Sequence, residues 1–176
     1  MTWDQYFMDM CDLVATKSKD TSTKVGAVIV GRERQDVRST GFNGFPRGIF
    51  DDVSEVEKLG TEAEYGIIFT GPEYLKQVRK LKTRLERPLK YMLSEHAERN
   101  AVYAAAAVGV PLAGCMLYVN SLPPCHDCAR AIIQTGIKEI IHAEGEVPER
   151  WKESCGVGRE MLEEAGVLIR TVVRNK

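Results

Sequence analysis

The sequence contains the stretch Val25-Gly26-Ala27-Val28-Ile29-Val30, which is apolar at every position. A surface strand alternates apolar and polar residues, so a strand that is apolar on both faces is typical of the centre of a covered sheet. A charged turn around Gly31 to Gln35 follows, and the pattern predicts a second strand over 37–42. The two strands together predict a hairpin at the centre of the fold.

Helical and strand patterns alternate on both sides of this hairpin. Before it, apolar residues repeat every three to four positions behind a Thr2-to-Gln5 capping box, which predicts a helix over about 3–17. Beyond it, the pattern predicts a three-layer α/β fold with helices on the faces of the sheet. Strands are expected over 115–119, 137–142 and 167–173, and helices over about 95–108, 125–135 and 160–165.

Length and composition favour one domain. The chain has 176 residues, of which 44% are hydrophobic and 28% charged, as in ordinary globular proteins. A chain of this length buries a core without help from metal or disulfides, so a metal site is expected to serve chemistry. Between Asp51 and Leu93 the chain is charged and poorly patterned apart from one apolar helical stripe. We therefore expect a single domain over 1–176 with a helical insertion at about 53–93.

Charge and hydropathy exclude several classes of partner. The 24 Lys and Arg residues are balanced by 25 Asp and Glu residues, so the excess of cations that binds polymeric nucleic acid is absent. No apolar run approaches the roughly 20 residues that span a bilayer. The N-terminal segment is acidic and lacks the basic region of a signal peptide. We expect a cytoplasmic protein that binds neither membranes nor polymeric nucleic acid.

Two short motifs carry the candidate chemistry, His96-Ala97-Glu98 and Pro124-Cys125-His126-Asp127-Cys128. Both fall at expected helix starts, and cysteines three residues apart share one face of a helix. Alone, a Cys-x-x-Cys pair is structural, redox-active or accidental. Together the motifs predict that His96, Cys125 and Cys128 hold one catalytic zinc. Three protein ligands leave a fourth position for a water, whose pKa falls to about 7 on zinc.

Glu98 is expected to be a general acid and base that carries a proton from this water to a substrate ring nitrogen. His126 points about 100° away from Cys125 around a helix, and His142 ends a strand, so neither is expected to be a fourth ligand. The other cysteines are expected to be buried apolar residues: Cys11, Cys115 and Cys155.

The pattern His-x-Glu followed by Pro-Cys-x-x-Cys is the signature of zinc-dependent nucleobase deaminases. Over most of its length the chain resembles one of these families, the deoxycytidylate (dCMP) deaminases. The segments that carry the likeness are Ser18 to Asp20 with Lys24 to Ala27, Gly41 to Gly48 with Asp51-Asp52, His96 to Ala101, and Pro124 to Ala129 with Gln134 to Ile137.

This resemblance implies a five-stranded mixed sheet and a zinc-dependent hydrolase with one zinc per subunit. It implies that dCMP is converted to dUMP and ammonia, with dUMP supplied to thymidylate synthesis. It further implies a homohexamer that dCTP activates and dTTP inhibits, with Mg²⁺ accompanying the triphosphate effector.

The substrate phosphate needs hydrogen-bond donors, and the loop of Ser22, Thr23 and Lys24 precedes the central strand, where ligands tend to bind. Lys24 is the expected phosphate partner. Asn43 offers an amide to a sugar hydroxyl, although Asn43-Gly44 is also a simple turn sequence. The resemblance adds Ala97 to the substrate contacts. It also implies an effector site between subunits at Gly41, Asn43, Gly44, Phe45, Arg47, Gly48 and Asp51, so Arg47 serves either regulation or catalysis.

The chain departs from the family in two places. The stretch between Asp52 and His96 is longer and carries a basic stripe, whose simplest interpretation is a solvated helix face and whose alternatives are subunit contact and effector binding. Ile49 and Phe50 stand where some viral relatives hold a second, structural zinc, so a single zinc is predicted. The stripe consists of Lys76, Arg79, Lys80, Lys82, Arg84 and Arg87.

Two rival functions remain open from the sequence. One is a deaminase of another cytosine or adenine substrate, such as dCTP, cytidine, RNA or single-stranded DNA, in which the same zinc core has a different rim. The other is a non-catalytic, zinc-containing nucleotide sensor, against which the presence of Glu98 argues.

Overall fold

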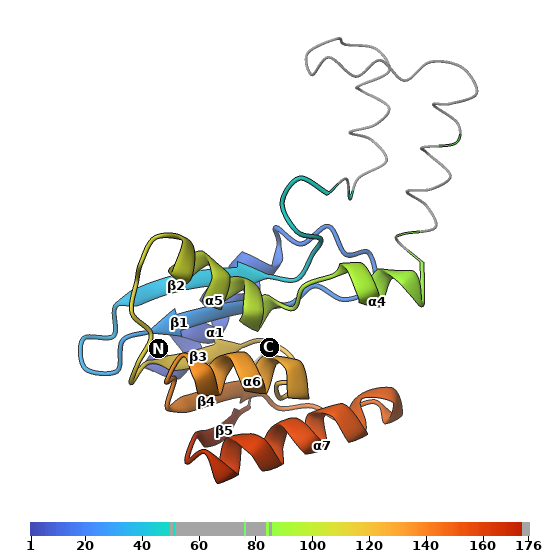
Figure 1. Cartoon of the computed structure of the whole chain (residues 1–176). Coiled ribbons are helices and arrows are strands. Elements are labelled where there is room, and N and C mark those ends of the chain that lie inside the picture. The colour runs from blue at the N-terminus through green and yellow to red at the C-terminus, as the bar shows by residue number, and fades with distance from the viewer. Residues whose placement is uncertain (50, 52–75, 77–83, 85, 174–176) are drawn as a thin grey trace. The chain divides into compact units, whose positions relative to one another are not determined.

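The computed structural model describes residues 1–49, 51, 76, 84 and 86–173 (Figure 1). The chain divides into two compact units, and each is described by itself. The first consists of Met1–Ser18, Ser22–Asn43 and His96–Lys176, and the second of Lys19–Thr21 and Gly44–Glu95. Most of the insertion expected at 53–93 lies outside the described residues, and so do Arg79, Lys80 and Lys82 of its basic stripe. Within the described residues, no helix is long and apolar enough to cross a membrane.

The first unit contains a five-stranded mixed sheet with the order β2-β1-β3-β4-β5 (Figure 1). Strand β1 pairs antiparallel with β2 and with β3, whereas β3, β4 and β5 are parallel. The mixed sheet implied by the resemblance is confirmed. The strands are β1 (Gly26–Val30), β2 (Val37–Phe42), β3 (Met116–Val119), β4 (Glu139–Ala143) and β5 (Leu168–Val172).

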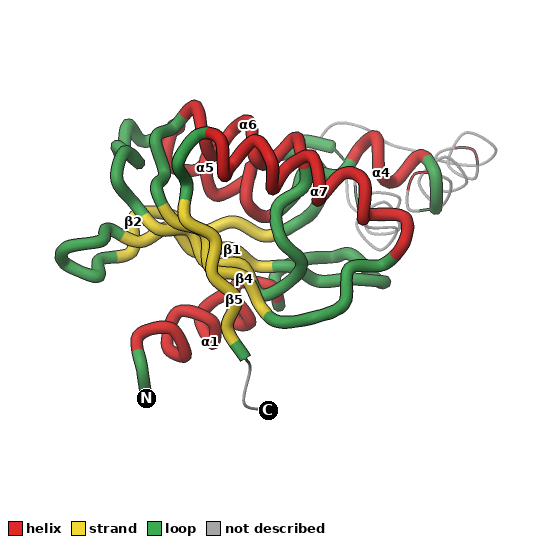
Figure 2. The backbone as a smooth tube through the Cα atoms, turned by 90° about the horizontal axis from the view of Figure 1, so that it is seen from below, coloured by secondary structure: helices red, strands yellow, loops and turns green. Residues whose placement is uncertain are grey.

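Helices cover both faces of this sheet and make three layers (Figure 2). Helix α1 lies on one face, and α5, α6 and α7 lie on the other. The side-chain oxygen of Thr2 accepts the Gln5 N–H at 3.2 Å, so α1 begins at the predicted cap. The helices of this unit are α1 (Trp3–Ala15), α5 (Ala97–Ala107), α6 (His126–Gln134) and α7 (Glu149–Glu164).

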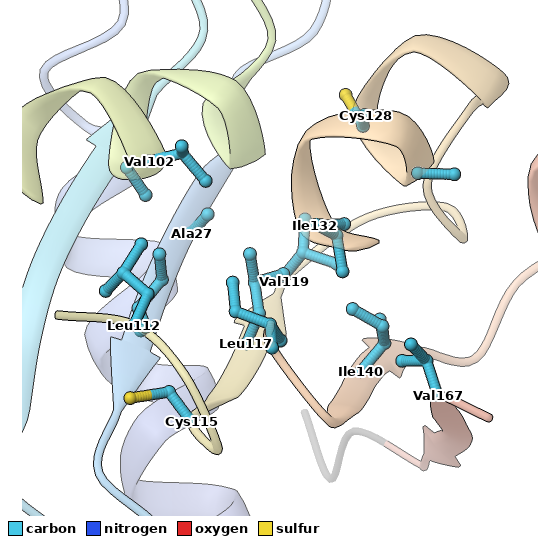
Figure 3. Close-up of a cluster of buried hydrophobic side chains, with 14 of the residues drawn as sticks. Ala27, Val102, Leu112, Cys115, Leu117, Val119, Cys128, Ile132, Ile140 and Val167 are labelled. Carbon is cyan, nitrogen blue, oxygen red and sulfur yellow. The ribbon is translucent and has the colours of Figure 1, made fainter. Parts of the chain in front are cut away.

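Strand β1 is buried on both faces, as its composition predicts. Ala27 and Ile29 belong to the core beneath α5 and α6, whereas Val28 and Val30 belong to the core beneath α1. All four side chains are fully buried. Figure 3 shows the first core, with Cys128 at its edge on α6 and the sulfur directed away from Ile132.

Helix α7 is the main correction to the sequence analysis. A helix was expected only over 160–165, but α7 begins at Glu149. The two glycines of Gly156-Val157-Gly158 argue against a helix by propensity. Gly158 is buried against the backbone of the loop 124–126, which leaves no room for a Cβ. Glycine is therefore required at this position although it lowers helix propensity. The other described helices and strands of this unit agree with their expected bounds to within two residues. Cys11, Cys115 and Cys155 are buried as expected.

The second unit contains α4 (Leu89–Leu93) and a buried ion pair. The Nζ of Lys90 lies 2.6 Å from the carboxylate of Asp20, and both side chains are at most 10% exposed. Lys19 and Asp51 form a second, more exposed pair at 2.8 Å. A buried pair is expensive to break, because loss of one partner leaves an uncompensated charge. The Lys90 pair therefore ties α4 to the segment Lys19–Thr21.

Candidate metal centre

Three potential ligands converge at the starts of two helices. His96 is the N-cap of α5, Cys125 is the N-cap of α6, and Cys128 is the third residue of α6. Their ligand atoms lie within 4.8 Å of one another. The Nδ1 of His96 is 3.4 Å from the sulfur of Cys125 and 3.4 Å from that of Cys128. Contrary to expectation, Cys125 lies just outside the helix, with extended backbone angles.

The donor set and its spacing fit zinc. In a tetrahedral site with Zn–N near 2.0 Å and Zn–S near 2.3 Å, the nitrogen and sulfur ligands are about 3.5 Å apart. The observed 3.4 Å separations match that value, so little rearrangement is needed to bind an ion. His126 and His142 have other partners: the first lies 2.8 Å from the hydroxyl of Ser154, and the second donates to the Ala143 carbonyl at 2.9 Å.

Proton positions in this cluster are strongly coupled. The sulfur of Cys125 accepts hydrogen bonds from the Cys128 thiol and from His96. These two bonds lower the pKa of Cys125 to about 3, although burial opposes them. The hydrogen bond between His96 and Cys125 raises the pKa of His96 to about 9, although burial acts in the opposite direction. The pKa of Cys128 is raised because it donates to Cys125 and is buried. A metal ion must therefore displace protons from His96 and Cys128 when it binds.

Glu98 lies beside these ligands on the first turn of α5, and only 6% of it is exposed. Burial raises the pKa of its carboxyl group, and the nearby His96 and Cys128 only partly oppose that rise. A carboxyl group with a raised pKa exchanges protons more easily near neutral pH than an exposed one. The structure thus places a buried carboxyl group with a raised pKa next to the three potential ligands.

The expected phosphate loop is exposed. Ser22, Thr23 and Lys24 lie between α1 and β1 with their side chains in solvent. Asn43 holds this loop: its amide oxygen accepts the Val25 N–H at 2.8 Å, and its amide nitrogen donates to the Thr23 carbonyl at 2.9 Å. Asn43 is therefore more than a turn residue, and it shapes the loop that was expected to bind phosphate.

The residues expected at the effector site are divided between the two units. Gly41 is buried in the first unit, where a Cβ would lie 2.4 Å from the Ala97 carbonyl oxygen and 2.2 Å from the Ala101 nitrogen. A glycine at position 41 is thus required for close packing of β2 on α5. Ala97 is also fully buried. Gly44, Phe45, Arg47, Gly48 and Asp51 belong to the second unit.

A family model for the zinc-binding region of cytidine and deoxycytidylate deaminases matches residues 1–144. The chain belongs to this family. The resemblance that its motifs carry is thereby confirmed, and the chain is an enzyme of the deaminase class. The three potential ligands and Glu98 all lie within the matched region.

Relatives of this deaminase include animal, phage and bacterial proteins. It is 32% identical to the deoxycytidylate deaminase of Homo sapiens over 98% of this chain and 81% of that one. The corresponding enzyme of enterobacteria phage T4 is 37% identical over 75% of this chain and 72% of its own. A deaminase of Aliivibrio fischeri, described as uncharacterized, is 34% identical over 94% of this chain and 90% of its own.

Solved structures share the fold of this deaminase. The dCMP deaminase of cyanophage S-TIM5 superimposes with a TM-score of 0.62 and 21% identity over 96% of both chains. The Rib2 deaminase of Aspergillus oryzae gives a TM-score of 0.58 and 20% identity over 98% of this chain and 86% of that one. Both confirm the three-layer architecture.

One residue at the metal centre of the deaminase was missed from the sequence. Trp151 of α7 meets the ring of His96 edge to face, with ring centroids 5.8 Å apart and an interplanar angle of 75°. Trp151 was missed because this helix was expected to begin only at 160, whereas α7 begins at Glu149. The available signal was Pro148 followed by Glu149, a proline and an acid at a helix start.

Proposed function

We propose that this deaminase converts dCMP and water to dUMP and ammonia, with one zinc per subunit held by His96, Cys125 and Cys128. The observation that carries the proposal is the convergence of these ligand atoms beside the buried Glu98. The choice of substrate is supported by relatives that are named deoxycytidylate deaminases and cover most of this chain. The S-TIM5 enzyme, which shares the fold, has been crystallised with dCMP and dUMP.

The three ligands supply one neutral nitrogen and two thiolates, a set that leaves room for a fourth ligand in a tetrahedral zinc site. Zinc bound there would act as a Lewis acid and make water nucleophilic at neutral pH. The hydrogen bonds that lower the pKa of Cys125 favour its thiolate form before any metal arrives.

Glu98 is assigned the proton transfers. Its carboxylate would accept a proton from the attacking water and pass it to N3 of the cytosine ring, as the new C4–O bond forms. It would then take the remaining hydroxyl proton and give it to the departing amino group as the C4–N bond breaks. Each transfer returns Glu98 to its starting state, and the raised pKa of its carboxyl group suits both directions.

The phosphate of dCMP is assigned to the exposed loop of Ser22, Thr23 and Lys24. A lysine ammonium and two hydroxyl groups are donors of the kind that phosphate oxygens require. Asn43 supports this loop through its bonds to Val25 and Thr23. Any contact of Asn43 with the sugar must therefore be made by the same amide that shapes the loop. Ala97 is assigned a substrate contact on the strength of the resemblance alone, and the whole residue is buried.

Regulation is proposed on the strength of the resemblance alone. dCTP would activate and dTTP would inhibit, with Mg²⁺ on the triphosphate, at the loop around Asn43, Gly44, Phe45, Arg47, Gly48 and Asp51 between subunits of a homohexamer. Gly41, although expected in this group, is accounted for by its packing against α5. Native mass and dCMP turnover, measured with and without each triphosphate, test these statements.

The proposed activity is tested by assaying dCMP, dCTP, cytidine, cytosine and a cytosine-containing oligonucleotide side by side with the zinc-loaded enzyme. We expect ammonia and dUMP from dCMP at the highest kcat/KM of the five. Turnover of the oligonucleotide, or of cytidine, without turnover of dCMP would refute the choice of substrate. Absence of turnover on all five, with nucleotide still bound, would favour the non-catalytic sensor.

A further inference from the structure

Helix α7 lies beside α6 in the first unit (Figure 1). Four residues of α7, at spacings of three, four and seven residues, contact His96 or the loop 123–126 that contains Cys125, and we call them the ligand-facing stripe: Trp151, Ser154, Cys155 and Gly158. Such spacings place side chains on one face of a helix. The burial pattern agrees, because the stripe is partly or fully buried. The residues between its members are exposed: Lys152, Glu153, Gly156 and Val157.

We propose that the ligand-facing stripe positions His96 and the Cys125 loop for metal binding, and so sets the zinc affinity of this enzyme. The inference rests on the metal-binding part of the proposed function. Helix α7 starts at Glu149, whereas the match to the family model ends at residue 144. The family motif thus supplies the ligands, and a helix outside it would hold them in place.

Trp151, at the N-terminal end of the ligand-facing stripe, contacts the ring of His96. The indole of Trp151 meets the imidazole edge to face at 5.8 Å, a preferred arrangement for aromatic pairs. Rotation of the imidazole about its bond to Cβ would break this contact and turn Nδ1 away from the two sulfurs. The half-buried Trp151 therefore favours the ring orientation in which Nδ1 points at Cys125 and Cys128.

The middle of the stripe braces the loop on both sides of Cys125. The hydroxyl of Ser154 lies 2.8 Å from Nδ1 of His126, the residue that follows Cys125. The thiol of Cys155 donates to the carbonyl of Pro123 at 3.3 Å, two residues before Cys125. Outer partners of this kind orient metal ligands and typically change metal affinity by about 10- to 100-fold when removed.

Gly158, at the C-terminal end of the ligand-facing stripe, lies against the backbone of the loop that contains Cys125. A Cβ on Gly158 would lie 2.6 Å from the Pro124 carbonyl oxygen, 2.9 Å from the Cys125 carbonyl carbon and 3.0 Å from the His126 nitrogen. Backbone atoms cannot move aside as the end of a flexible side chain can. A glycine within a helix costs stability relative to alanine, and this close approach explains its presence. By contrast, nothing lies within 4 Å of a Cβ built on Gly156.

These two glycines make a matched test within one helix. Zinc affinity is measured by competition with a chromogenic chelator, and ligand geometry by the visible spectrum of the cobalt-substituted protein. We expect Gly158→Ala to weaken zinc binding by at least about 10-fold and to shift the cobalt bands. Gly156→Ala should match the wild type in both measurements. Thermal unfolding of the metal-free proteins shows whether each variant is folded.

Variants of Trp151 provide a second test of the positioning role, which is used if Gly158→Ala does not fold. Trp151→Ala should weaken zinc binding by about 10-fold, and Trp151→Phe should restore most of it because an aromatic edge remains. If the wild type binds no zinc, both this inference and the proposed function are wrong. If the wild type binds zinc and the folded alanine variants bind it equally with unchanged cobalt spectra, only the positioning role is wrong.

Discussion

The Nδ1 of His96 lies 3.4 Å from the sulfur of Cys125, although 29 residues separate them in sequence. Each residue is the N-cap of its own helix, His96 of α5 and Cys125 of α6. Partial positive charge at the start of a helix favours thiolate over thiol, so the arrangement prepares sulfur for a cation. From this relationship follow predictions about the metal, the proton carrier and the surrounding fold.

Replacing Cys125 or Cys128 by Ala should abolish both bound zinc and turnover, because two ligands cannot retain the ion. Cys115→Ala is the matched control, since this cysteine is similarly buried but lies just before β3, outside the ligand group. Elemental analysis of the purified proteins checks the result. A full equivalent of zinc in Cys125→Ala would show that the ligands are misassigned.

Glu98→Gln should keep its zinc and lose roughly 10²- to 10⁴-fold in kcat, the usual contribution of a general acid and base. The neutral amide is expected to be tolerated, because burial already favours the neutral form of this side chain. Zinc content and the rate of ammonia release are measured on the same preparation. A zinc-loaded variant with wild-type kcat would remove Glu98 from the mechanism.

Lys24→Ala should lower kcat/KM for dCMP by about 10- to 100-fold, the range expected for a lost charge-assisted hydrogen bond. Deoxycytidine lacks the phosphate, so its kcat/KM should change little. The ratio of the two losses is the informative quantity. Equal losses on both substrates would move the phosphate site away from the Ser22 to Lys24 loop.

Acid sensitivity is expected from the Asp4 and Arg170 pair, whose charged atoms are 2.8 Å apart. The Arg170 hydrogen bond lowers the pKa of Asp4 below its ordinary value of 3.8. A lowered folded-state pKa means that the stabilisation is complete above pH 3.8 and is lost as the pH falls below it. The difference in unfolding free energy between wild type and Asp4→Asn should therefore shrink from pH 6 to pH 3. A constant difference would show that the charge of Asp4 contributes nothing.

Gly41→Ala should destabilise the fold by about 1–3 kcal/mol, because the added methyl overlaps the backbone of α5. Gly44→Ala is the control, since a Cβ there meets nothing within 4 Å. Denaturant unfolding of the zinc-loaded proteins gives both values. Unchanged stability in Gly41→Ala would return Gly41 to the candidate effector residues.

Local patterns predicted the five strands of the sheet and part of the candidate metal centre. Strand β1 was identified because every residue is apolar, and the structure buries all of them. His96, Cys125 and Cys128 were found because ligand spacing at helix starts is visible in the sequence. Asn43 was assigned to the substrate, yet its amide bonds to Thr23 and Val25, and such long-range backbone partners leave no local pattern.

Two features depended on contacts that the sequence does not reveal. The first part of α7 was missed because Gly158 lowers helix propensity, and the Cys125 loop that requires this glycine is 33 residues away. The buried pair of Lys90 and Asp20 was missed because 70 residues separate the partners. In both cases tertiary packing outweighs local propensity.

Zinc-edge X-ray absorption on the purified enzyme tests the metal centre most directly. We expect one zinc per chain with two sulfur ligands near 2.3 Å and two lighter ligands near 2.0 Å, one of them imidazole. A third sulfur, or protein that binds no zinc after reconstitution, would contradict a site made by His96, Cys125 and Cys128 beside Glu98.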